Sequence, residues 1–592
     1  RDLRMSRGLG DVYKRQAATH AADFKYQWHH TIYGKTKAGN TPVSIIKTTD
    51  GNYVAFTTFG SNTLTDTKLY FDGEPLKNAE GKEVEGCQYV GNNVNATNNN
   101  LLLQKYDQKT GDLLWTVYSD KGYLYNNQAI QPTEDGGLIL ISDVRNLADR
   151  TEKTLFRMVG ADGVKTEVTY TPDSIKRTIT EGVIAKIDKN GKVEWAKLIA
   201  TTAHPMQKYF GGYAAFYRGL ALDNKGNIYI CGHYMSSMTF TKRDKTTETH
   251  EAKSAEGWDG TIQSQVGDPF IAKLDKDGYL LQFMTEDESN LKFASFDRIV
   301  IKEGIIYLSG RFQGNGTATI KFGDTILQPN DCVNIIYASL NCNDLSMNYI
   351  KSFVTGRFNG KSYGIQNKNL QYYNGSLYLT GLLLGSLADN ATSSPFIAVS
   401  DKYYEALVVK IDAKDGKRLA AGIDGKGITG AFGVVETKDP KAVWVYGYAL
   451  FGMSRLNKYT LEDNKMVKGA EEVTLNKAQI GMVCEPLIDG TGFVSMGRAS
   501  NDSGTILGAT GEPTTFFNWG IVLTKYTCDD ILPDEDTSTG IKDVNVQKDR
   551  VANCNVYTLA GVLVKRAKTM AEATSGLPSG LYIIGGKKIV VK

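Results

Sequence analysis

The sequence predicts an all-β fold built from repeated four-strand units, and three observations lead to this prediction. Two kinds of hairpin alternate along the chain, each with apolar residues at every second position around an Asp/Asn/Gly turn. The last repeat stops before its fourth strand, and a segment of the missing type precedes the first repeat. Seven such units closed head to tail form a seven-bladed β-propeller, in which radial repetition leaves no long free edge.

The clearest unit runs from Gly219 to Thr285 and contains four predicted strands, A to D. Its A–B hairpin is "GLALDNKGNIYICGHY", and its C–D hairpin is "FIAKLDKDGYLLQFMT". The A–B hairpin recurs near Asp50, Asp135, Asp223, Gly304, Gly375, Asp439 and Asp489. The C–D hairpin follows each of them, although the copy "IVLTKYTCDD" ends after strand C.

The missing strand D is predicted near the start of the chain. The segment "FKYQWHHTIY" places Trp28 before the first A strand, as Trp115 and Trp195 stand before theirs. We therefore predict that the N-terminal strand completes the last blade, with Trp28 near Lys525. An open β-solenoid is the alternative repeat fold, but an open stack has no reason to take a strand from its beginning.

The long insertions are predicted to collect on one face of the ring. The A–B and C–D turns are short, whereas the B–C connections are long, at 59–99, 144–181, 234–268, 312–333, 383–405 and 498–518. B–C and D–A connections share one rim, and loops mounted on a scaffold are common sites of binding. The candidate ligand-binding residues are the aromatics of this face: Tyr209, Phe210, Tyr213, Trp258, Phe516 and Phe517. Their flat apolar rings suit sugars or partner surfaces; the alternative is that they hold the loops against the blades.

The remaining segments differ in composition from the repeats. Residues 1–16 resemble a translated sequencing adapter and are set aside, and 17–22 are interpreted as the remnant of a secretion signal. The propeller is assigned to 23–530, an acidic linker to 531–541 and a small C-terminal β-sandwich to 542–592.

The C-terminal segment resembles the sorting domain of cargo of the Bacteroidota type IX secretion system. The pattern combines "NVYTLAGVLVKR" with "LPSGLYIIGGKKIVVK". The matching residues are Val556, Tyr557, Gly561, Leu577, Gly580, Tyr582, Gly586, Lys587, Lys588 and Val590. The resemblance implies export through that machinery, followed by release or attachment at the outer-membrane surface. An unrelated Ig-like cap is the alternative.

The sequence lacks the motifs of several classes of functional site. The net charge of +3 argues against a nucleic-acid surface, and no apolar run reaches the roughly 18 residues of a transmembrane helix. The 7 Cys are scattered, so neither a metal site nor a disulfide framework is expected, and Cys332 and Cys342 are interpreted as free thiols. "GKGITG" at Gly425 fits a D–A loop better than a dinucleotide site, because no helix follows it. The "DKDG" segments place Gly too early for calcium-binding EF-hands.

"KYDQKTGDLLW" resembles a repeat of quinoprotein-type propellers, in which D-x-x-x-G-x-x-x-W docks one blade on the next. Such dehydrogenases usually have eight blades and an adjacent Cys pair, and this sequence has neither. We expect an exported, monomeric propeller without a cofactor that binds a glycan or a protein. A secreted glycan hydrolase or lyase is the first alternative, and a quinone-dependent oxidoreductase is a minor one.

Overall fold

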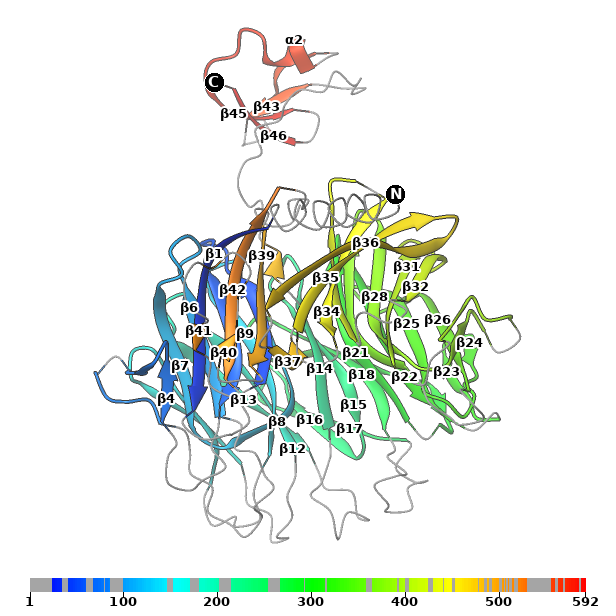
Figure 1. The fold of residues 1–592 in the computed structure, drawn as a ribbon, viewed down its shortest axis with the longest axis horizontal. Helices are drawn as coiled ribbons and strands as arrows, with labels where there is room; N and C mark the ends of the chain where they lie inside the picture. The colour runs from blue at the N-terminus through cyan, green and yellow to red at the C-terminus, as the bar shows by residue number, and fades with distance from the viewer. Residues whose placement is uncertain are drawn as a thin grey trace, which may run out of the picture. The chain divides into compact units, whose positions relative to one another are not determined.

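The structure is a computed structural model that divides into two compact units, 1–532 and 533–592, and each unit is described by itself (Figure 1). It describes residues 24–34, 41–59, 68–78, 80–85, 100–145, 153–170, 180–201, 215–253, 267–291, 293–314, 317–357, 365–390, 393–399, 404–423, 430–439, 441–449, 453–476, 479–483, 487–488, 492–499, 503–504, 506, 509, 514–515, 520–529, 555–558, 563–567, 570–584 and 587–591.

The described strands of the first unit group into successive four-strand blades, each in the order A, B, C, D. Blade 1 contains β2 (Thr41–Lys47), β3 (Tyr53–Phe59), β6 (Asn100–Tyr106) and β7 (Leu113–Lys121). Blade 2 contains β8 (Tyr123–Pro132), β9 (Leu138–Arg145), β12 (Thr180–Ile187) and β13 (Val193–Thr201). Blade 3 contains β14 (Ala215–Leu222), β15 (Ile228–Tyr234), β18 (Asp268–Leu274) and β19 (Leu280–Thr285).

The later blades follow the same order. Blade 4 contains β21 (Phe293–Lys302), β22 (Ile305–Gln313), β25 (Asn334–Asn341) and β26 (Met347–Gly356). Blade 5 contains β27 (Ile365–Tyr373), β28 (Ser376–Leu383), β31 (Glu405–Asp412) and β32 (Arg418–Ile423). Blade 6 contains β33 (Gly430–Glu436), β34 (Ala442–Ala449), β35 (Met453–Glu462) and β36 (Lys465–Asn476). A single parallel residue pair, Ala421 with Lys465, links blades 5 and 6.

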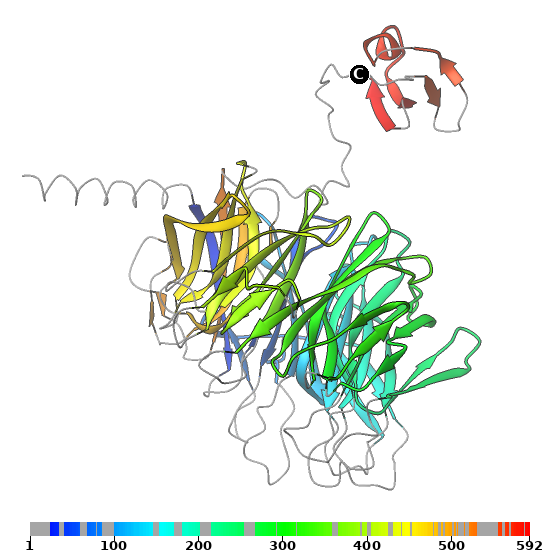
Figure 2. The same cartoon turned by 90° about the vertical axis from the view of Figure 1, so that its right-hand side faces the viewer.

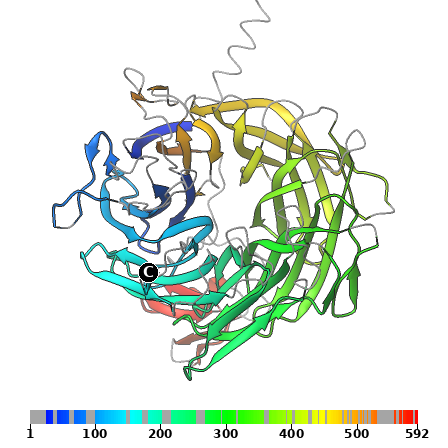
Figure 3. The same ribbon diagram turned by 90° about the horizontal axis from the view of Figure 1, so that it is seen from below.

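The last blade is closed by the N-terminal strand, as the displaced Trp-bearing segment predicts. Strands β37 (Gln479–Val483) and β38 (Leu487–Ile488) pair with β39 (Gly492–Ala499), β39 pairs with β42 (Ile521–Cys528), and β42 pairs with β1 (Phe24–Gly34). Trp28 is the register partner of Lys525. Figure 3 shows the blades in chain order around a circle, with the dark blue N-terminal strand beside the orange strands of the last blade. The predicted all-β propeller and its closure are therefore confirmed.

The A strands form the inner ring of the propeller. Contacts join β2 to β8, β8 to β14, β14 to β21, β21 to β27, β27 to β33 and β2 to β37. The blades consequently pack face to face around this ring (Figure 2). We call the rim that carries the B–C and D–A connections the loop side, and the rim that carries the A–B and C–D turns the turn side.

Tryptophans of the D strands dock on the C–D turn of the next blade, as the D-x-x-x-G-x-x-x-W pattern implies. Each turn Gly has a positive φ, and a Cβ there would lie within about 3 Å of the preceding blade's indole ring. The pairs are Trp28 with Gly111, Trp115 with Gly191 and Trp195 with Gly278. Glycine is required at these turns because it permits both the backbone conformation and the close approach.

The sequence predicts that the B–C insertions enlarge one face of the ring, but in the structure several of them also pair with the neighbouring blade. In blades 1, 2, 3 and 5 they form hairpins that pair with the outer strand of the preceding blade. These hairpins are β4 (Leu69–Phe71) and β5 (Glu74–Pro75) on β1, β10 (Thr154–Val159) and β11 (Lys165–Thr169) on β7, β16 (Ser237–Thr241) and β17 (Thr247–Glu251) on β13, and β29 (Ser386–Ala388) and β30 (Ile397–Ala398) on β26. Each hairpin covers an otherwise open strand edge.

Two small sheets complete the described part of the first unit. β20 (Glu288–Ser289) pairs with the hairpin of β23 (Ile320–Phe322) and β24 (Thr325–Leu327), and β40 (Ser503–Gly504) pairs with β41 (Thr514–Thr515). Cys332 and Cys342 are buried free thiols, as expected. No helix among the described residues combines the length and the apolar character needed to cross a membrane.

The second unit contains one antiparallel sheet in its described part. Its order is β44 (Leu563–Lys565), β43 (Val556–Thr558), β45 (Gly580–Ile584) and β46 (Lys587–Val591), with the short helix α2 (Met570–Thr574). The small core consists of Val556, Ala567, Ala573 and Ile584. Leu577 and Tyr582 pack against this core, while Val590 is exposed. The second layer of a sandwich is not among the described residues, and Gly561 and Gly586 lie outside them.

Candidate functional site

The aromatic residues proposed from the sequence lie outside the described part of the chain. This applies to Tyr209, Phe210, Tyr213, Trp258, Phe516 and Phe517. Their role in ligand binding stays a prediction. The described residues instead bring together a charged cluster on the inner ring, which the sequence reasoning did not find.

The cluster arises from a β-bulge that recurs in the A strands. In blades 3, 4 and 5 one extra residue interrupts the A–B register, at Arg218, Asp297 and Lys368. A strands begin at the loop side and B strands end there. Each bulge lies close to the start of its A strand and therefore near the loop side. A bulge bends the strand and redirects a side chain.

A glycine on the neighbouring B strand makes room for each of these bulges. Gly232, Gly310 and Gly381 are the register partners of the residue that precedes the bulge. A Cβ at Gly310 would collide with the carbonyl oxygen of Ser295, and one at Gly381 with that of Gln366. Glycine is thus required at Gly310 and Gly381, where the bulged strand comes closest.

Four cationic side chains surround Asp297, and we call Arg218, Arg298, Arg311 and Lys368 the cationic cluster. Arg311 Nε donates to Asp297 Oδ2 at 2.6 Å, and Arg218 Nε lies 3.6 Å from Asp297 Oδ1. Arg298 Nε donates to the carbonyl oxygen of Lys368 at 2.6 Å. Three blades therefore contribute cations to one place on the ring.

The electrostatics of this cluster follow from burial and mutual proximity. Burial alone would raise the pKa of Asp297, but Arg311 and Arg218 outweigh it and hold that pKa well below its usual range. Burial, together with Arg298 and the other arginines, lowers the pKa of Lys368 to about 8. Asp143 also favours the charged form of Arg218, so these cations are balanced by more than one carboxylate.

The cations remain accessible to solvent, whereas their carboxylate partner does not. The side chains of Arg218 and Arg311 are 25% and 24% exposed, against 3% for Asp297. Lys368 and Arg298 are also only half-buried.

A serine, a histidine and an aspartate lie together beside the cluster, but their order is not that of a hydrolase triad. Ser295 Oγ donates to Asp297 Oδ1 at 2.8 Å, and His233 Nδ1 lies 3.1 Å from Ser295 Oγ. In a triad the histidine stands between serine and aspartate and accepts the serine proton. Here the serine proton points to the aspartate, and both Ser295 and His233 are fully buried. Burial and Arg218 also lower the pKa of His233 well below its ordinary value. This trio is a structural support for the cluster.

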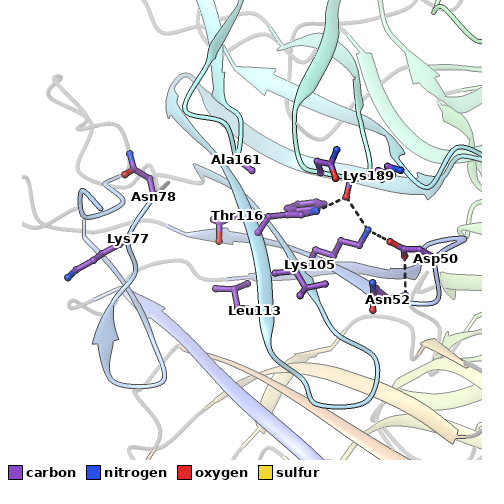
Figure 4. Close-up of a pocket in the computed structure, with 12 residues that line it drawn as sticks. Asp50, Asn52, Lys77, Asn78, Lys105, Leu113, Thr116, Ala161 and Lys189 are labelled. Carbon is purple, nitrogen blue, oxygen red and sulfur yellow. Dashed lines mark hydrogen bonds and ion pairs between the residues drawn. The ribbon is translucent and has the colours of Figure 1, made fainter. Parts of the chain in front are cut away.

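Apart from the cluster, a hollow with a volume of about 610 Å³ lies on the turn side, between blades 1 and 2 (Figure 4). Lys105 Nζ donates to Asp50 Oδ2 at 2.6 Å and to the carbonyl oxygen of Lys189 at 3.2 Å. Trp115 Nε1 donates to the same carbonyl oxygen at 3.0 Å. These polar groups bond one blade to the next, so the hollow is a joint between blades.

The sequence does contain a signal for the cationic cluster. Charged residues interrupt the apolar alternation of the A strands in "YRGLAL", "FDRIVI" and "NKNLQY". A charged residue within an A strand of the inner ring indicates either a β-bulge or a functional site. Here the charged residues lie at the bulges and also form the candidate site. The signal is visible only once the repeats are aligned with one another.

Comparisons with known proteins add little to this description. No model of a known protein family matches the chain, and no curated protein matches its sequence. Among solved structures, the quinohemoprotein alcohol dehydrogenase of Comamonas testosteroni is 12% identical with a TM-score of 0.38, over 90% of this chain and 80% of that one. A europium-containing methanol dehydrogenase is 11% identical with a TM-score of 0.33, over 87% and 94%. The Dos1 propeller is 8% identical with a TM-score of 0.35, over 86% and 96%. The assignment of the fold rests on the strand pairing described above.

Proposed function

We propose that this protein is an exported binding protein whose propeller holds a glycan or protein ligand at the loop-side end of its inner ring. The observation that carries the proposal is the cationic cluster, in which three blades contribute half-buried charged side chains to one place on the ring. Arg218 and Arg311 are 25% and 24% exposed, so a ligand can reach their positive charge.

The ionised state of the Asp297 carboxyl group favours a binding function over glycoside hydrolysis. A glycosidase requires a protonated carboxyl group as general acid and a second carboxylate on the other side of the bond. Arg311 and Arg218 keep Asp297 ionised, and Arg311 and Ser295 occupy its oxygens. Asp297 is therefore suited to orient the cations and is unsuited to donate a proton.

Export is proposed from the C-terminal sequence pattern. The described residues of the pattern belong to a compact sheet, in which Val556 is buried and Leu577 and Tyr582 pack against the core. In this proposal the second unit serves as the sorting domain, and the propeller acts outside the cell or at its surface. Deletion of 542–592 should leave the propeller inside the producing cell, whereas unchanged secretion would exclude this role.

The test of the binding function uses the full chain on a glycan array, combined with a pull-down from surface extracts. Retention of a defined glycan or of one protein partner supports the proposal. Turnover of a polysaccharide by the purified chain would establish the hydrolase or lyase alternative instead. Dye reduction after incubation with a quinone cofactor would establish the oxidoreductase alternative.

A further inference from the structure

We propose that the hollow between blades 1 and 2 is a separate binding site, which takes a neutral oligosaccharide. Its volume of about 610 Å³ lies within the roughly 300–1,000 Å³ that is usual for ligand pockets. The hollow belongs to the turn side, whereas the proposed function concerns the loop-side end of the inner ring. The inference therefore goes beyond the proposed function and is tested separately from it.

Strand β7 gives the hollow an apolar wall that is open to solvent. Leu114 is 48% exposed, and Leu113 and Trp115 are half-buried. One side of the indole of Trp115 is covered, since a Cβ at Gly191 would lie 3.0 Å from it. Among the described residues, no aromatic ring and no cation stacks on this indole. A flat aromatic surface of this kind suits the apolar C–H face of a sugar ring.

The equivalent joints between other blades are filled by side chains of the chain itself. The ring of His30 lies 5.3 Å from that of Trp28, and Trp28 is only 7% exposed. Lys197 Nζ likewise lies 5.3 Å from the ring centroid of Trp195. Both covering residues stand two positions after the tryptophan, where blade 1 has a valine of the core instead. The joint at Trp115 is therefore left open to a ligand.

Polar groups without a protein partner line the same hollow. Thr116 Oγ1, the side-chain amide of Asn190 and Asn52 Nδ2 have no hydrogen-bond partner among the described residues. Figure 4 shows Asn78 on one side of the hollow and Thr116 on the other. Hydroxyl and amide groups donate and accept hydrogen bonds, as the hydroxyl groups of a sugar do. An apolar wall beside such groups matches a pyranose ring better than an apolar peptide side chain, which would leave the polar groups unused.

The charges in the hollow favour a neutral ligand. The side chain of Lys105 is 2% exposed, and its Nζ donates to Asp50 Oδ2 at 2.6 Å, so these two charges neutralise each other. Lys77 and Lys189 also line the hollow, but both are exposed, and water and salt screen their charge. An acidic ligand would therefore gain little over a neutral one.

The test measures binding of four probes to the full chain by isothermal titration calorimetry at pH 7. Three are neutral tetrasaccharides, namely cellotetraose, mannotetraose and maltotetraose, and the fourth is a hexaglutamate peptide. We expect saturable binding of at least one tetrasaccharide. Binding of no tetrasaccharide would overturn the inference. Binding of hexaglutamate alone would also overturn it and would indicate a peptide site instead.

Variants connect the affinity to the hollow. Leu114→Ala and Asn190→Ala should each weaken tetrasaccharide binding at least about fivefold, whereas Leu281→Ala should not change it. Leu281 is the matched control, because it is 50% exposed and stands at the same position after the C–D turn glycine, in blade 3. The residue that follows Leu281 is Gln282, so this strand has no tryptophan to offer. If Leu114→Ala does not fold, as judged by circular dichroism, Asn190→Ala decides.

The same titrations separate this site from the inner ring. Native affinity in both folded variants of the hollow would refute the site. Loss of binding in Arg218→Gln, with native affinity in Leu114→Ala, would place the sugar at the inner ring; this overturns the inference and leaves the proposed function intact. Weaker binding in Leu114→Ala but not in Leu281→Ala supports the inference, even if the loop side proves to bind nothing.

Discussion

Replacement of Trp28 by alanine tests the closure of the ring. Trp28 is 7% exposed, and its ring centroid lies 5.3 Å from that of His30, 6.2 Å from that of Tyr53 and 6.3 Å from that of Tyr106. It also covers the turn glycine Gly111 of blade 1. Trp28 thus joins the N-terminal strand of the last blade to the first blade. Truncation of a buried tryptophan to alanine costs about 3–5 kcal/mol.

The expected result is a free energy of unfolding lowered by about 3–5 kcal/mol, at an unchanged slope with urea concentration. Equilibrium unfolding in urea, followed by far-ultraviolet circular dichroism, measures both quantities. Leu114→Ala is the control, because Leu114 is 48% exposed on the outer strand of blade 1 and should change stability by no more than about 0.5 kcal/mol. If Trp28→Ala behaves like this control, the N-terminal strand does not hold the ring together and the reasoning is refuted.

Three further predictions concern stability. Gly278→Ala should lower the melting temperature more than Gly304→Ala. The two glycines have the same φ, +79° and +78°, but a Cβ at Gly278 would lie 2.9 Å from the docking tryptophan, whereas no atom lies within 4 Å of one at Gly304. Equal losses would exclude a role for the docking contact. Burial raises the pKa of Glu286 to about 7, so the folded chain binds more protons than the unfolded chain between about pH 4.5 and 7, and stability falls as the pH rises through this range. Urea unfolding at pH 5 and pH 8 measures this fall in the free energy of unfolding, and Glu286→Gln should make the fall smaller by up to about 3 kcal/mol. The same fall in the native chain and in the variant would contradict the prediction. Asp297→Asn should cost about 3–5 kcal/mol in the same assay, because it leaves Arg311 without its buried counter-ion; a loss below about 1 kcal/mol would show that the pair contributes little.

Much of the ring was predictable because its signals are local and repeated. Apolar alternation around Asp/Gly turns sets the hairpins, and the position of Trp28 before the first A strand indicates which end supplies the missing strand. The resemblance of "KYDQKTGDLLW" to quinoprotein-type repeats also indicated that the turn glycine and the tryptophan dock one blade on the next. In each case a short segment contains the residues that determine the local structure.

The outer hairpins were not predictable in the same way. Strands such as β4 and β29 contain 3 residues each, which is too short to show a period. Their partners, β1 and β26, lie in the preceding blade, so their pairing depends on the finished ring. The sequence indicates that the insertions are long, but it does not indicate that they cover strand edges.

The cationic cluster depends on register, which a single sequence does not specify. Without the bulges at Arg218, Asp297 and Lys368, strict alternation would assign these side chains to a different face of the A strand. The bulge itself depends on a glycine of the next strand, such as Gly310. The site is therefore set by the pairing of two strands.

The most direct test of the closed ring is a disulfide between its two ends. Lys25 and Thr527 are register partners in the pairing of β1 with β42. In the variant Lys25→Cys/Thr527→Cys, mild oxidation should link the two segments, as detected by mass spectrometry of the digested chain. Register partners in antiparallel strands have Cα atoms about 4.5–5.5 Å apart, which is within the range of a disulfide. The variant Lys25→Cys/Lys302→Cys, which joins the last blade to blade 4, should form no such link. Absence of the Lys25–Thr527 link, or its formation no faster than in the control, would contradict the closure of this propeller by its N-terminal strand.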